Sequence, residues 1–439
     1  MRVGIIGGGV TGLTAAHEFT KLGHQVEVFE KSPELGGQAS TFNLGGAPLE
    51  RLYHHLFTSD HYAIEMLEEL GLGSKLEWID SRVGLYHGGR IWPWVTPMDL
   101  LRFSNISVLD RMRLGLVTLY LQKKTDGLVY EDVTAAEWLS HKVGRRGFEA
   151  VWEPLLRGKF GDYHSEVSMT WLWGKIRLRV GSRGKGMARE KLAYPLGSFG
   201  ILSDELAKRI AGGGGQIHTS ASVIGVELDG GRACGLRVVM DGKENIVPFD
   251  AILATIPSFA FERIVTSIPS DYAELLRSTN YLSALVLVLV LDRQMLPVYW
   301  LNIADRGIPF VAVIEHTNFI PPSQYGGRHI VYVSNYLKPD SPLYGRGKEE
   351  LLAEYAPHLK RLNSAFDPGW VKESYLFRED GAQPVITRGY SRKIPTHRTP
   401  VECLYLANTA QIYPEDRGVN YSIRLGRDIA KLIASEMSR

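Results

Sequence analysis

The sequence predicts an α/β fold built on a parallel sheet. Residues 2–29 run through a short apolar strand pattern, a glycine-rich turn, a helix pattern and a second strand pattern. Buried strand patterns recur at residues 250–257 and 403–408, and a helix pattern follows the second of them. Short apolar runs that alternate with helices are typical of parallel sheets covered by helices. We therefore expect segments from both ends of the chain to share one sheet.

The first turn has the pattern G-x-G-x-x-G, formed by Gly7, Gly9 and Gly12, with Val10 and Thr11 before the last glycine. Gly7 permits a tight turn, Gly9 lets a pyrophosphate approach the bare backbone, and Gly12 lets the helix pack closely on the strand. The unpaired N–H groups and the positive dipole end of that helix favour the pyrophosphate. In this strand–turn–helix–strand context the motif predicts a Rossmann-like dinucleotide-binding site.

An acidic residue and a second glycine pair follow the second strand. Glu30 would accept hydrogen bonds from both hydroxyls of an adenosine ribose, which disfavours a 2′-phosphate there. Lys31 comes next, and Gly36 and Gly37 precede Gln38. NAD does not require such a glycine pair, but the pair suits a loop that passes close to a longer, extended cofactor. An ordinary turn is the alternative.

With these residues the chain resembles the flavin superfamily of amine oxidases, protoporphyrinogen oxidases and carotenoid desaturases. In that superfamily a Gly-Gly pair at this spacing lies along FAD, so the resemblance implies FAD as the cofactor. Those families usually place an arginine after the pair. Gln38 departs from this pattern, and a cation against the diphosphate is missing at that point.

The end of the chain resembles the closing FAD motif of the same superfamily. The strand at residues 403–408 is expected to meet the ribityl-phosphate, and Gly418, Val419 and Asn420 open a helix that points at the flavin pyrimidine edge. The backbone N–H groups of Val419 and Asn420 would stabilise the negative charge that builds on the reduced flavin. Asn408 stands where these families commonly have aspartate, and it can still hydrogen-bond the phosphate or the ribityl chain. A C-terminal αβ unit without a ligand is the alternative.

The middle of the chain agrees with both ends. A helix pattern at residues 201–210 and a strand pattern at residues 216–219 lead to Val223. The resemblance implies that Val223 brackets the adenine with its backbone. The likeness is strong at these three cofactor segments and weak in the substrate region.

The resemblance also implies how the domains are divided. A Rossmann-like FAD-binding domain of the glutathione-reductase type, with a βαβ unit and a central parallel sheet, would comprise residues 1–80, 190–270 and 395–439. An α+β substrate-binding domain, with a mixed sheet and a helical subdomain, would comprise residues 81–189 and 271–394. Its first piece reads as mostly helical and its second as strand-rich, with one helix at residues 348–362.

Composition narrows the class of protein. The chain has 439 residues and a net charge of +2, so nothing favours nucleic-acid binding. Cys234 and Cys403 lie far apart and give neither a metal-ligand spacing nor a disulfide framework. They fit a reduced, cytoplasmic compartment and, since neither lies in a recognisable flavinylation setting, non-covalent FAD. No signal peptide is expected, and the longest apolar run, residues 284–291, is too short to span a bilayer.

The chemistry is expected to be that of the flavin, because no hydrolytic triad, metal cluster or P-loop stands out. With only one dinucleotide motif, oxygen, a quinone or another acceptor is favoured over NAD(P)H as the electron partner. His54 and His55 fall where the superfamily's chain passes under the isoalloxazine, and this segment also resembles UDP-galactopyranose mutases. A histidine that caps a turn beside a solvated one is the alternative.

Three further residues are candidates for catalysis. Tyr413 and Arg417 precede the flavin-facing helix, although their loop reads equally as a salt-bridged surface loop. Tyr421 would line the same cavity. Lys338 follows a strand pattern and could reach the flavin N5 through water, as a lysine does in many amine oxidases.

A run of cations is expected to bind a carboxylate or diphosphate, to face anionic lipid, or to be a solvated helix face. It comprises Lys175, Arg177, Arg179, Arg183, Lys185, Arg189 and Lys191. The nearby Trp152, Trp171 and Trp173 would line a cavity or belong to the core. Residues 98–122 could dock peripherally on a membrane or pack as buried helices.

Three functions remain open from sequence. The first is an FAD-dependent oxidase or dehydrogenase that takes a hydride from a C–N or C–C bond of a small organic substrate. The second is a redox-neutral flavin mutase acting on a nucleotide sugar. The third is a flavoprotein that binds its cofactor without chemistry.

Overall fold

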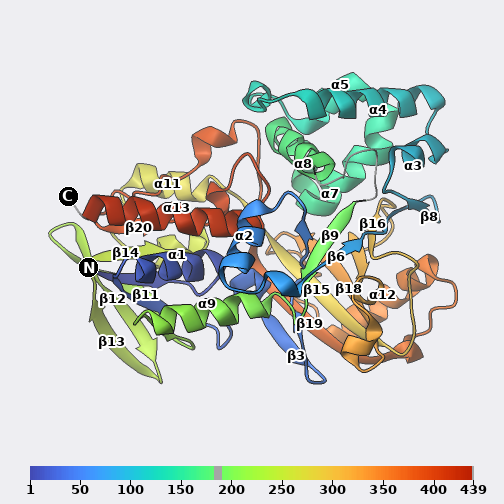
Figure 1. Ribbon diagram of the computed structural model, residues 1–439. Helices are drawn as coiled ribbons and strands as arrows, with labels where there is room; N and C mark the ends of the chain where they lie inside the picture. The colour runs from blue at the N-terminus through green and yellow to red at the C-terminus, as the bar shows by residue number, and fades with distance from the viewer. Residues whose placement is uncertain (182–189, 438–439) are drawn as a thin grey trace.

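The computed structural model describes residues 1–181 and 190–437, which adopt a mixed α/β fold with a parallel sheet (Figure 1). Arg183, Lys185 and Arg189 of the cation run lie outside the described residues. The parallel sheet has the strand order β10-β2-β1-β14-β20. Its strands are β1 (Arg2–Ile6), β2 (Gln25–Phe29), β10 (Gln216–His218), β14 (Ala251–Ala254) and β20 (Leu404–Leu406). The prediction that both ends of the chain share one parallel sheet is confirmed.

Three helices pack together on one face of this sheet: α1 (Val10–Lys21), α9 (Gly200–Gly212) and α13 (Val419–Met437) (Figure 1). Helix α1 lies between the other two and buries nearly its whole length. It approaches α13 closely at Gly426, where a Cβ atom would lie 2.7 Å from the carbonyl oxygen of Thr11. The first and last helices of the fold are therefore held in direct backbone proximity.

The other side of the parallel sheet is covered by an antiparallel three-stranded meander. It consists of β11 (Ser222–Asp229), β12 (Arg232–Met240) and β13 (Lys243–Pro248). Its buried side chains pack with Ile6, Phe29 and Phe249, together with α10 (Ser258–Ile264) and α11 (Ser270–Arg277).

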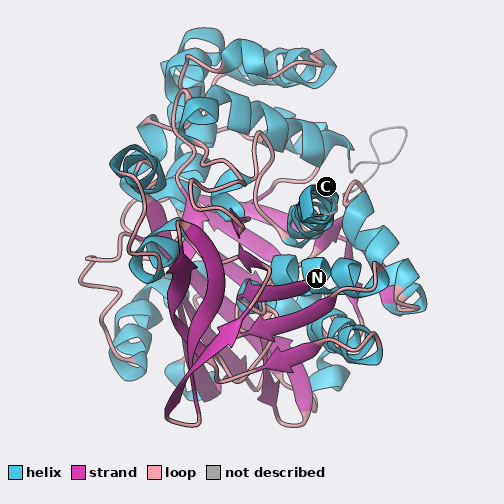
Figure 2. Ribbon diagram, turned by 90° about the vertical axis from the view of Figure 1, so that its left-hand side faces the viewer, coloured by secondary structure: helices cyan, strands magenta, loops and turns pink. Residues whose placement is uncertain are grey.

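A second, mixed sheet of seven strands has the order β19-β15-β18-β17-β16-β7-β8. Strands fill the middle of the molecule, and helices lie above them and on both sides (Figure 2). The predicted strands of residues 271–394 are present, and α12 (Lys348–Leu362) has the predicted bounds. The strands are β7 (Val83–His87), β8 (Arg90–Pro93), β15 (Tyr281–Leu291), β16 (Trp300–Ile303), β17 (Ala312–Glu315), β18 (His329–Leu337) and β19 (Val371–Pro384). The hairpin β7–β8 lies in a range that was expected to be mostly helical, because its turn at Gly88 and Gly89 was not recognised.

A layer of helices stands at one end of the molecule, away from the meander (Figure 1). It contains α3 (Pro97–Arg102), α4 (Val108–Lys123), α5 (Ala135–Val143), α6 (Arg145–Gly147), α7 (Glu153–Phe160) and α8 (Met169–Gly181). Trp171 and Trp173 are buried in its core and Trp152 packs against it, so the core reading of these residues is correct. Within the described residues no helix has the length and apolar character needed to cross a bilayer.

The remaining elements join these parts. They are the hairpin β3 (Thr41–Leu44) and β4 (Ala47–Glu50), helix α2 (His61–Glu69), and a small sheet of β5 (Leu56–Phe57), β9 (Lys191–Pro195) and β6 (Leu76–Asp80). The domain division at residues 80, 190, 270 and 395 stays a prediction.

Candidate flavin and substrate site

The first glycine turn has the geometry that a dinucleotide motif needs. Gly7 has φ +107° and donates its N–H to the carbonyl oxygen of Phe29 at 2.9 Å. A Cβ atom on Gly12 would lie 2.0 Å from the carbonyl oxygen of Gly7. Such a contact is impossible without opening the turn, so the helix can start this close to the strand only with glycine there.

The Gly-Gly loop lies directly against this turn. Gly36 donates its N–H to the carbonyl oxygen of Gly8 at 2.9 Å, and a Cβ atom on Gly37 would lie 3.1 Å from the Cα atom of Gly9. Gln38 donates from Nε2 to the carbonyl oxygen of Gly381 at 3.1 Å, which fastens the loop to β19. The side chain of Gln38 is therefore used as a brace within the protein.

The start of α1 has no side-chain cap among the described residues, and its first turn holds no acidic residue. The first N–H groups of a helix have no partner within the helix. Here those groups belong to the turn that begins at Val10 and Thr11, next to the contact between Gly9 and Gly37. The arrangement fits a pyrophosphate, because backbone donors and the helix dipole then meet a negative charge.

Glu30 lies at the carboxyl end of β2, as predicted. Its carboxylate accepts the N–H of Gly8 at 2.7 Å and the N–H of Ser32 at 2.8 Å, so both oxygens are fixed in place. Its carbonyl oxygen accepts the N–H of Ala221 at 2.8 Å, which places the start of β11, and with it Val223, beside Glu30. Lys31 is exposed at the mouth of this region.

Asn408 does not fit its predicted role. Its side-chain Nδ2 donates to the carbonyl oxygen of Ile256 at 3.0 Å and to Oγ of Ser258 at 3.2 Å, and its Oδ1 accepts the N–H of Ala410 at 3.0 Å. Both amide hydrogens are thus used inside the protein. The residue joins the loop after β20 to the loop after β14, and the expectation that its side chain contacts a phosphate or ribityl chain stays a prediction.

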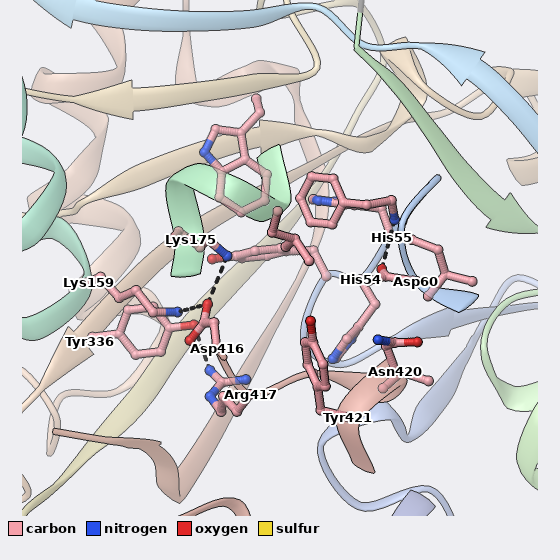
Figure 3. A pocket seen from close by; sticks show the side chains of 17 residues that line it. His54, His55, Asp60, Lys159, Lys175, Tyr336, Asp416, Arg417, Asn420 and Tyr421 are labelled. Atoms are coloured by element: carbon pink, nitrogen blue, oxygen red, sulfur yellow. Dashed lines mark hydrogen bonds and ion pairs between the residues drawn. The ribbon is translucent and has the colours of Figure 1, made fainter. Parts of the chain in front are cut away.

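A cavity of about 150 Å³ opens at the start of α13 (Figure 3). A smaller cavity of about 30 Å³ adjoins it and shares four of its lining residues. Residues from six parts of the chain line the larger one: Tyr53, His54, His55, Leu56, Phe57, Asp60, Lys159, Lys175, Leu178, Trp300, Tyr336, Asp416, Arg417, Gly418, Val419, Asn420 and Tyr421. His54, His55, Arg417, Gly418, Val419 and Asn420 were all predicted site residues, and the structure brings them together.

Charge dominates one wall of this cavity. The buried Asp416 carboxylate lies 2.9 Å from Nζ of Lys159 and 2.8 Å from Nζ of Lys175 (Figure 3). Burial acts to raise the pKa of Asp416, but the two ammonium groups outweigh it and hold the pKa well below its usual range. Burial lowers the pKa of Lys159, and Asp416 opposes that shift. The carboxylate is therefore ionised whenever the protein is folded near neutral pH.

Arg417 adds a third cation. It donates from Nε to the side-chain oxygen of Gln383 at 3.0 Å and from NH2 to the hydroxyl of Tyr336 at 2.9 Å. Burial acts to raise the pKa of Tyr336, yet the guanidinium of Arg417 and the ammonium of Lys159 lower it overall. Arg417 is thereby held over the cavity by β18 and β19.

The two histidines are neutral side chains of this cavity. Burial lowers the pKa of His54 to about 4 and that of His55 to about 3, and nearby cations act in the same direction. Nδ1 of His54 lies 2.6 Å from the carbonyl oxygen of Leu52, which can only accept, so Nδ1 carries the hydrogen and Nε2 is an acceptor. Nδ1 of His55 lies 3.2 Å from the hydroxyl of Tyr299.

The carboxyl group of Asp60 and the side-chain amide of Asn420 also line the cavity. Asp60 accepts the N–H of Phe57 at 2.8 Å, and burial raises its pKa to about 6. Asn420 accepts the N–H of Ala63 at 3.1 Å through Oδ1 and so ties the start of α13 to α2.

Two of the predicted catalytic residues lie elsewhere. Tyr413 donates its hydroxyl to Glu131 and its ring lies against that of Tyr390, within the helical layer. Lys338 follows the end of β18 on the surface, where its Nζ pairs with Asp162 at 3.0 Å. Neither side chain lines the cavity, and the catalytic roles expected for them stay predictions.

Sequence reasoning missed several cavity residues, of which Lys159, Tyr336 and Asp416 carry the most chemistry. Asp416 stood in a loop that reads as an ordinary salt-bridged cluster, and part of that reading is right, since Glu415 pairs with Arg424 at 3.0 Å. Lys175 belonged to the cation run, but nothing local paired it with Asp416. No signal in the sequence joins helices α7 and α8 to this loop.

Comparison with known proteins agrees with this geometry. The chain is 40% identical over 317 residues to the flavin-dependent L-tryptophan oxidase of Lentzea aerocolonigenes, a match covering 64% of each protein. The chain spans less than two thirds of the length of the curated relatives it matches.

Two solved structures share the fold over nearly the whole chain. A putative protoporphyrinogen oxidase from Exiguobacterium sp. 255-15 has a TM-score of 0.78 at 17% identity and covers 99% of both chains. Reduced UDP-galactopyranose mutase has a TM-score of 0.75 at 15% identity, with 99% of this chain and 96% of that chain covered.

The family model described as flavin containing amine oxidoreductase matches residues 10–433, from the first turn of α1 to the last turns of α13. The match includes α1, every residue that lines the cavity and most of the closing helix, and the relatives include proteins named as oxidases. The chain therefore belongs to the flavin containing amine oxidoreductase family.

Proposed function

We propose that the protein binds FAD non-covalently and oxidises an organic substrate that carries an anionic group. It would remove a hydride from a C–N or C–C bond and pass the electrons to oxygen, a quinone or another acceptor. The observation that carries the proposal is the cationic wall of the cavity at the start of α13 (Figure 3).

FAD is favoured over a smaller flavin because the chain offers residues suited to an adenosine and a pyrophosphate as well as to the flavin ring. Glu30 would hold the adenosine ribose, Val223 would border the adenine, and the start of α1 with Gly9 and Gly37 would hold the pyrophosphate. The N–H groups of Val419 and Asn420 would face the pyrimidine edge. When bound, FAD supplies an acceptor for the hydride of a substrate C–H bond.

Non-covalent attachment is supported by the positions of the cysteines. Cys234 lies on β12 and Cys403 immediately before β20, and neither lines the cavity. A thioether to the flavin would require one of them at its edge. Denaturation is therefore expected to release all of the flavin into solution.

The charge of the cavity selects the substrate. Lys159, Lys175 and Arg417 face Asp416 and Asp60, so the cations exceed the carboxylates. A carboxylate or phosphate of the substrate would compensate this excess, since buried cations favour a desolvated anion. A substrate with only positive charges, such as a simple polyamine, would be repelled.

Asp416 adds a second requirement. Its Oδ2 forms ion pairs with both lysines, while Oδ1 is buried and has no hydrogen-bond partner among the described residues. A buried acceptor without a partner is costly. An N–H or O–H donor on the substrate would satisfy it, which together with the anion fits an amino acid or a hydroxylated acid. His54 offers one more acceptor at Nε2.

Anaerobic titration of the flavin-loaded protein tests this proposal. L-tryptophan is the first substrate to try, because the relative with 40% identity is named for it. Tryptamine is the matched control, since it keeps the ring and the amine and lacks the carboxylate. We expect bleaching of flavin absorbance with the acid and none with the amine. Equal bleaching by both would contradict an anion requirement.

A mutase remains a second candidate, because a nucleotide-sugar diphosphate would also compensate Lys159, Lys175 and Arg417. It would turn over UDP-galactopyranose only after the flavin has been reduced, with no net consumption of electrons. Bleaching by an organic acid followed by reoxidation in air would favour the oxidase.

A further inference from the structure

The outer face of the helical layer is apolar and exposed. Among the described residues, fifteen large apolar side chains are exposed to solvent, and ten of them lie between residues 98 and 129. They come from α3, α4 and the short turn Leu128–Tyr130. We call these ten residues the apolar face: Met98, Leu101, Val108, Leu109, Met112, Leu116, Leu119, Tyr120, Leu128 and Val129.

Helix α4 is apolar on two opposite sides. Leu114 and Leu121 are 2% and 0% exposed and pack inside the helical layer. At 3.6 residues per turn, the exposed residues of α4 fall on the other side, where Met112 is 55% and Leu116 is 65% exposed. One apolar stripe is enough to anchor a helix in a protein. A second stripe of this size on the surface marks a binding site for a partner or a membrane.

Cations border the apolar face. Helical spacing places Arg111 on one side of the exposed stripe of α4 and Arg113 on the other. Lys123 and Lys124 follow at the end of the helix and are exposed. Two acids lie nearby: Asp110 is buried and lies 3.9 Å from Arg113, whereas Asp126 is exposed and accepts the N–H of Leu128.

We propose that the apolar face docks on a bilayer that contains anionic lipid. Leucine, methionine and valine side chains would enter the interface, while the bordering cations would meet lipid phosphates and carboxylates. A second copy of the chain fits less well. Self-association about a two-fold axis would bring the cations that border the apolar face close to the same cations of the second copy, and the like charges would repel.

The face also lies close to the reaction site. Helix α4 packs on α8, and α8 contributes Lys175 and Leu178 to the cavity. The bilayer would therefore lie on the outer side of the helical layer whose inner side covers the substrate. This proposal does not depend on which substrate the cavity takes.

Flotation of the full-length, flavin-loaded protein with lipid vesicles tests the proposal. We expect the protein to float with vesicles of phosphatidylcholine and phosphatidylserine, and less with phosphatidylcholine alone. The double variant Met112→Gln/Leu116→Gln should lower the bound fraction roughly tenfold, because it removes apolar contact from the centre of the face. Ile246→Gln is the matched control, since Ile246 is 64% exposed on β13 at the far end of the molecule (Figure 1).

A second variant tests charge alone. Lys123→Gln/Lys124→Gln changes two exposed side chains, so folding should be unaffected, and it should weaken binding only to the vesicles that contain phosphatidylserine. The proposal is overturned if the native protein stays with the unbound fraction for both kinds of vesicle. It is also overturned if sedimentation shows a dimer that Met112→Gln/Leu116→Gln disperses while no vesicle binds, because a second copy would then occupy the face.

Discussion

The dinucleotide end and the cavity end of the site are built in opposite ways. At the predicted dinucleotide end, backbone groups within residues 7–37 would form the site, and close contacts between glycines leave no room for side chains on them. At the cavity, charged side chains from distant segments meet, as Lys175 and Asp416 do. The first end should therefore be sensitive to added atoms and the second to altered charge.

The largest effect is expected for Gly12→Ala. The new Cβ atom would lie 2.0 Å from a backbone oxygen that cannot move without opening the turn. We expect a loss of about 3 kcal/mol or more in the free energy of unfolding and loss of flavin from the purified protein. Urea unfolding and flavin absorbance measure both. Gly212→Ala is the control, because nothing lies within 4 Å of its Cβ position, and an unaltered Gly12→Ala protein would break the comparison.

Asp416→Asn should be the most damaging change at the cavity end. It keeps the volume but leaves the ammonium groups of Lys159 and Lys175 facing each other without their carboxylate. Removing one partner from a buried ionic cluster costs about 3–5 kcal/mol, which urea unfolding will detect. Adding Lys175→Met should restore part of the lost stability. If it restores none, charge is not what Asp416 contributes.

The neutral histidines make the cavity end sensitive to acid. The pKa values of His54 and His55 are lowered to about 4 and about 3, below the value of about 6.5 of an unfolded histidine. Between those values the unfolded chain binds more protons at these two histidines, so their contribution to stability is greatest above about pH 6.5 and falls as the pH drops toward 4. As the pH drops through that window, each histidine lowers the free energy of unfolding by about 3 kcal/mol.

Urea unfolding at a series of pH values will show this slope. His55→Asn should flatten it, whereas His141→Asn, at an exposed position on α5, should leave it unchanged. An identical slope in the native protein and His55→Asn would show that the histidine does not stay neutral.

Glu30→Gln sharpens the comparison at the dinucleotide end, since it changes charge and adds no atoms. The carboxylate holds the N–H groups of Gly8 and Ser32 and would hold the ribose. Charge-assisted hydrogen bonds are roughly twice as strong as neutral ones, so we expect the dissociation constant for FAD to rise roughly tenfold. Fluorescence titration measures it. Glu34→Gln, on the same loop, should leave it nearly unchanged, and equal losses would argue against a specific role for Glu30.

The smallest effect is expected for Lys338→Met. Nζ of Lys338 pairs with Asp162 on the surface, and both side chains are substantially exposed. We expect a change of at most about 0.5 kcal/mol in the free energy of unfolding and unaltered turnover. Loss of turnover with normal stability would restore the lysine as a candidate near the flavin.

The predictable parts of the molecule are those whose signals are local. Residues 2–29 contain a complete strand–turn–helix–strand pattern, and β15 is buried at every residue, so its apolar run identified it. Strand β19 was missed because charged and polar residues occupy much of its length, and only its pairing with β15 makes it a strand.

The site follows the same rule. The glycines, Glu30 and the start of α13 could be proposed from sequence because each lies in a motif with fixed spacing. The hydrogen bonds of Asn408 to Ile256 and Ser258 could not be foreseen, because these partners lie more than 100 residues away in sequence. Tyr336 and Lys159 were missed for that reason as well, since only the folded chain brings β18 and α7 to the loop before α13.

The strand order β10-β2-β1-β14-β20 has a consequence for biosynthesis. The sheet draws on the beginning, the middle and the end of the chain, so a nascent polypeptide that lacks residues 404–437 has neither its last parallel strand nor the helix that packs on α1. Apolar surface on α1 and β14 would stay open until these residues have been made, a stage at which exposed surface of this kind invites aggregation. Uptake of a flavin would accordingly have to wait for β20 and α13, because these two elements complete the sheet and its helical cover.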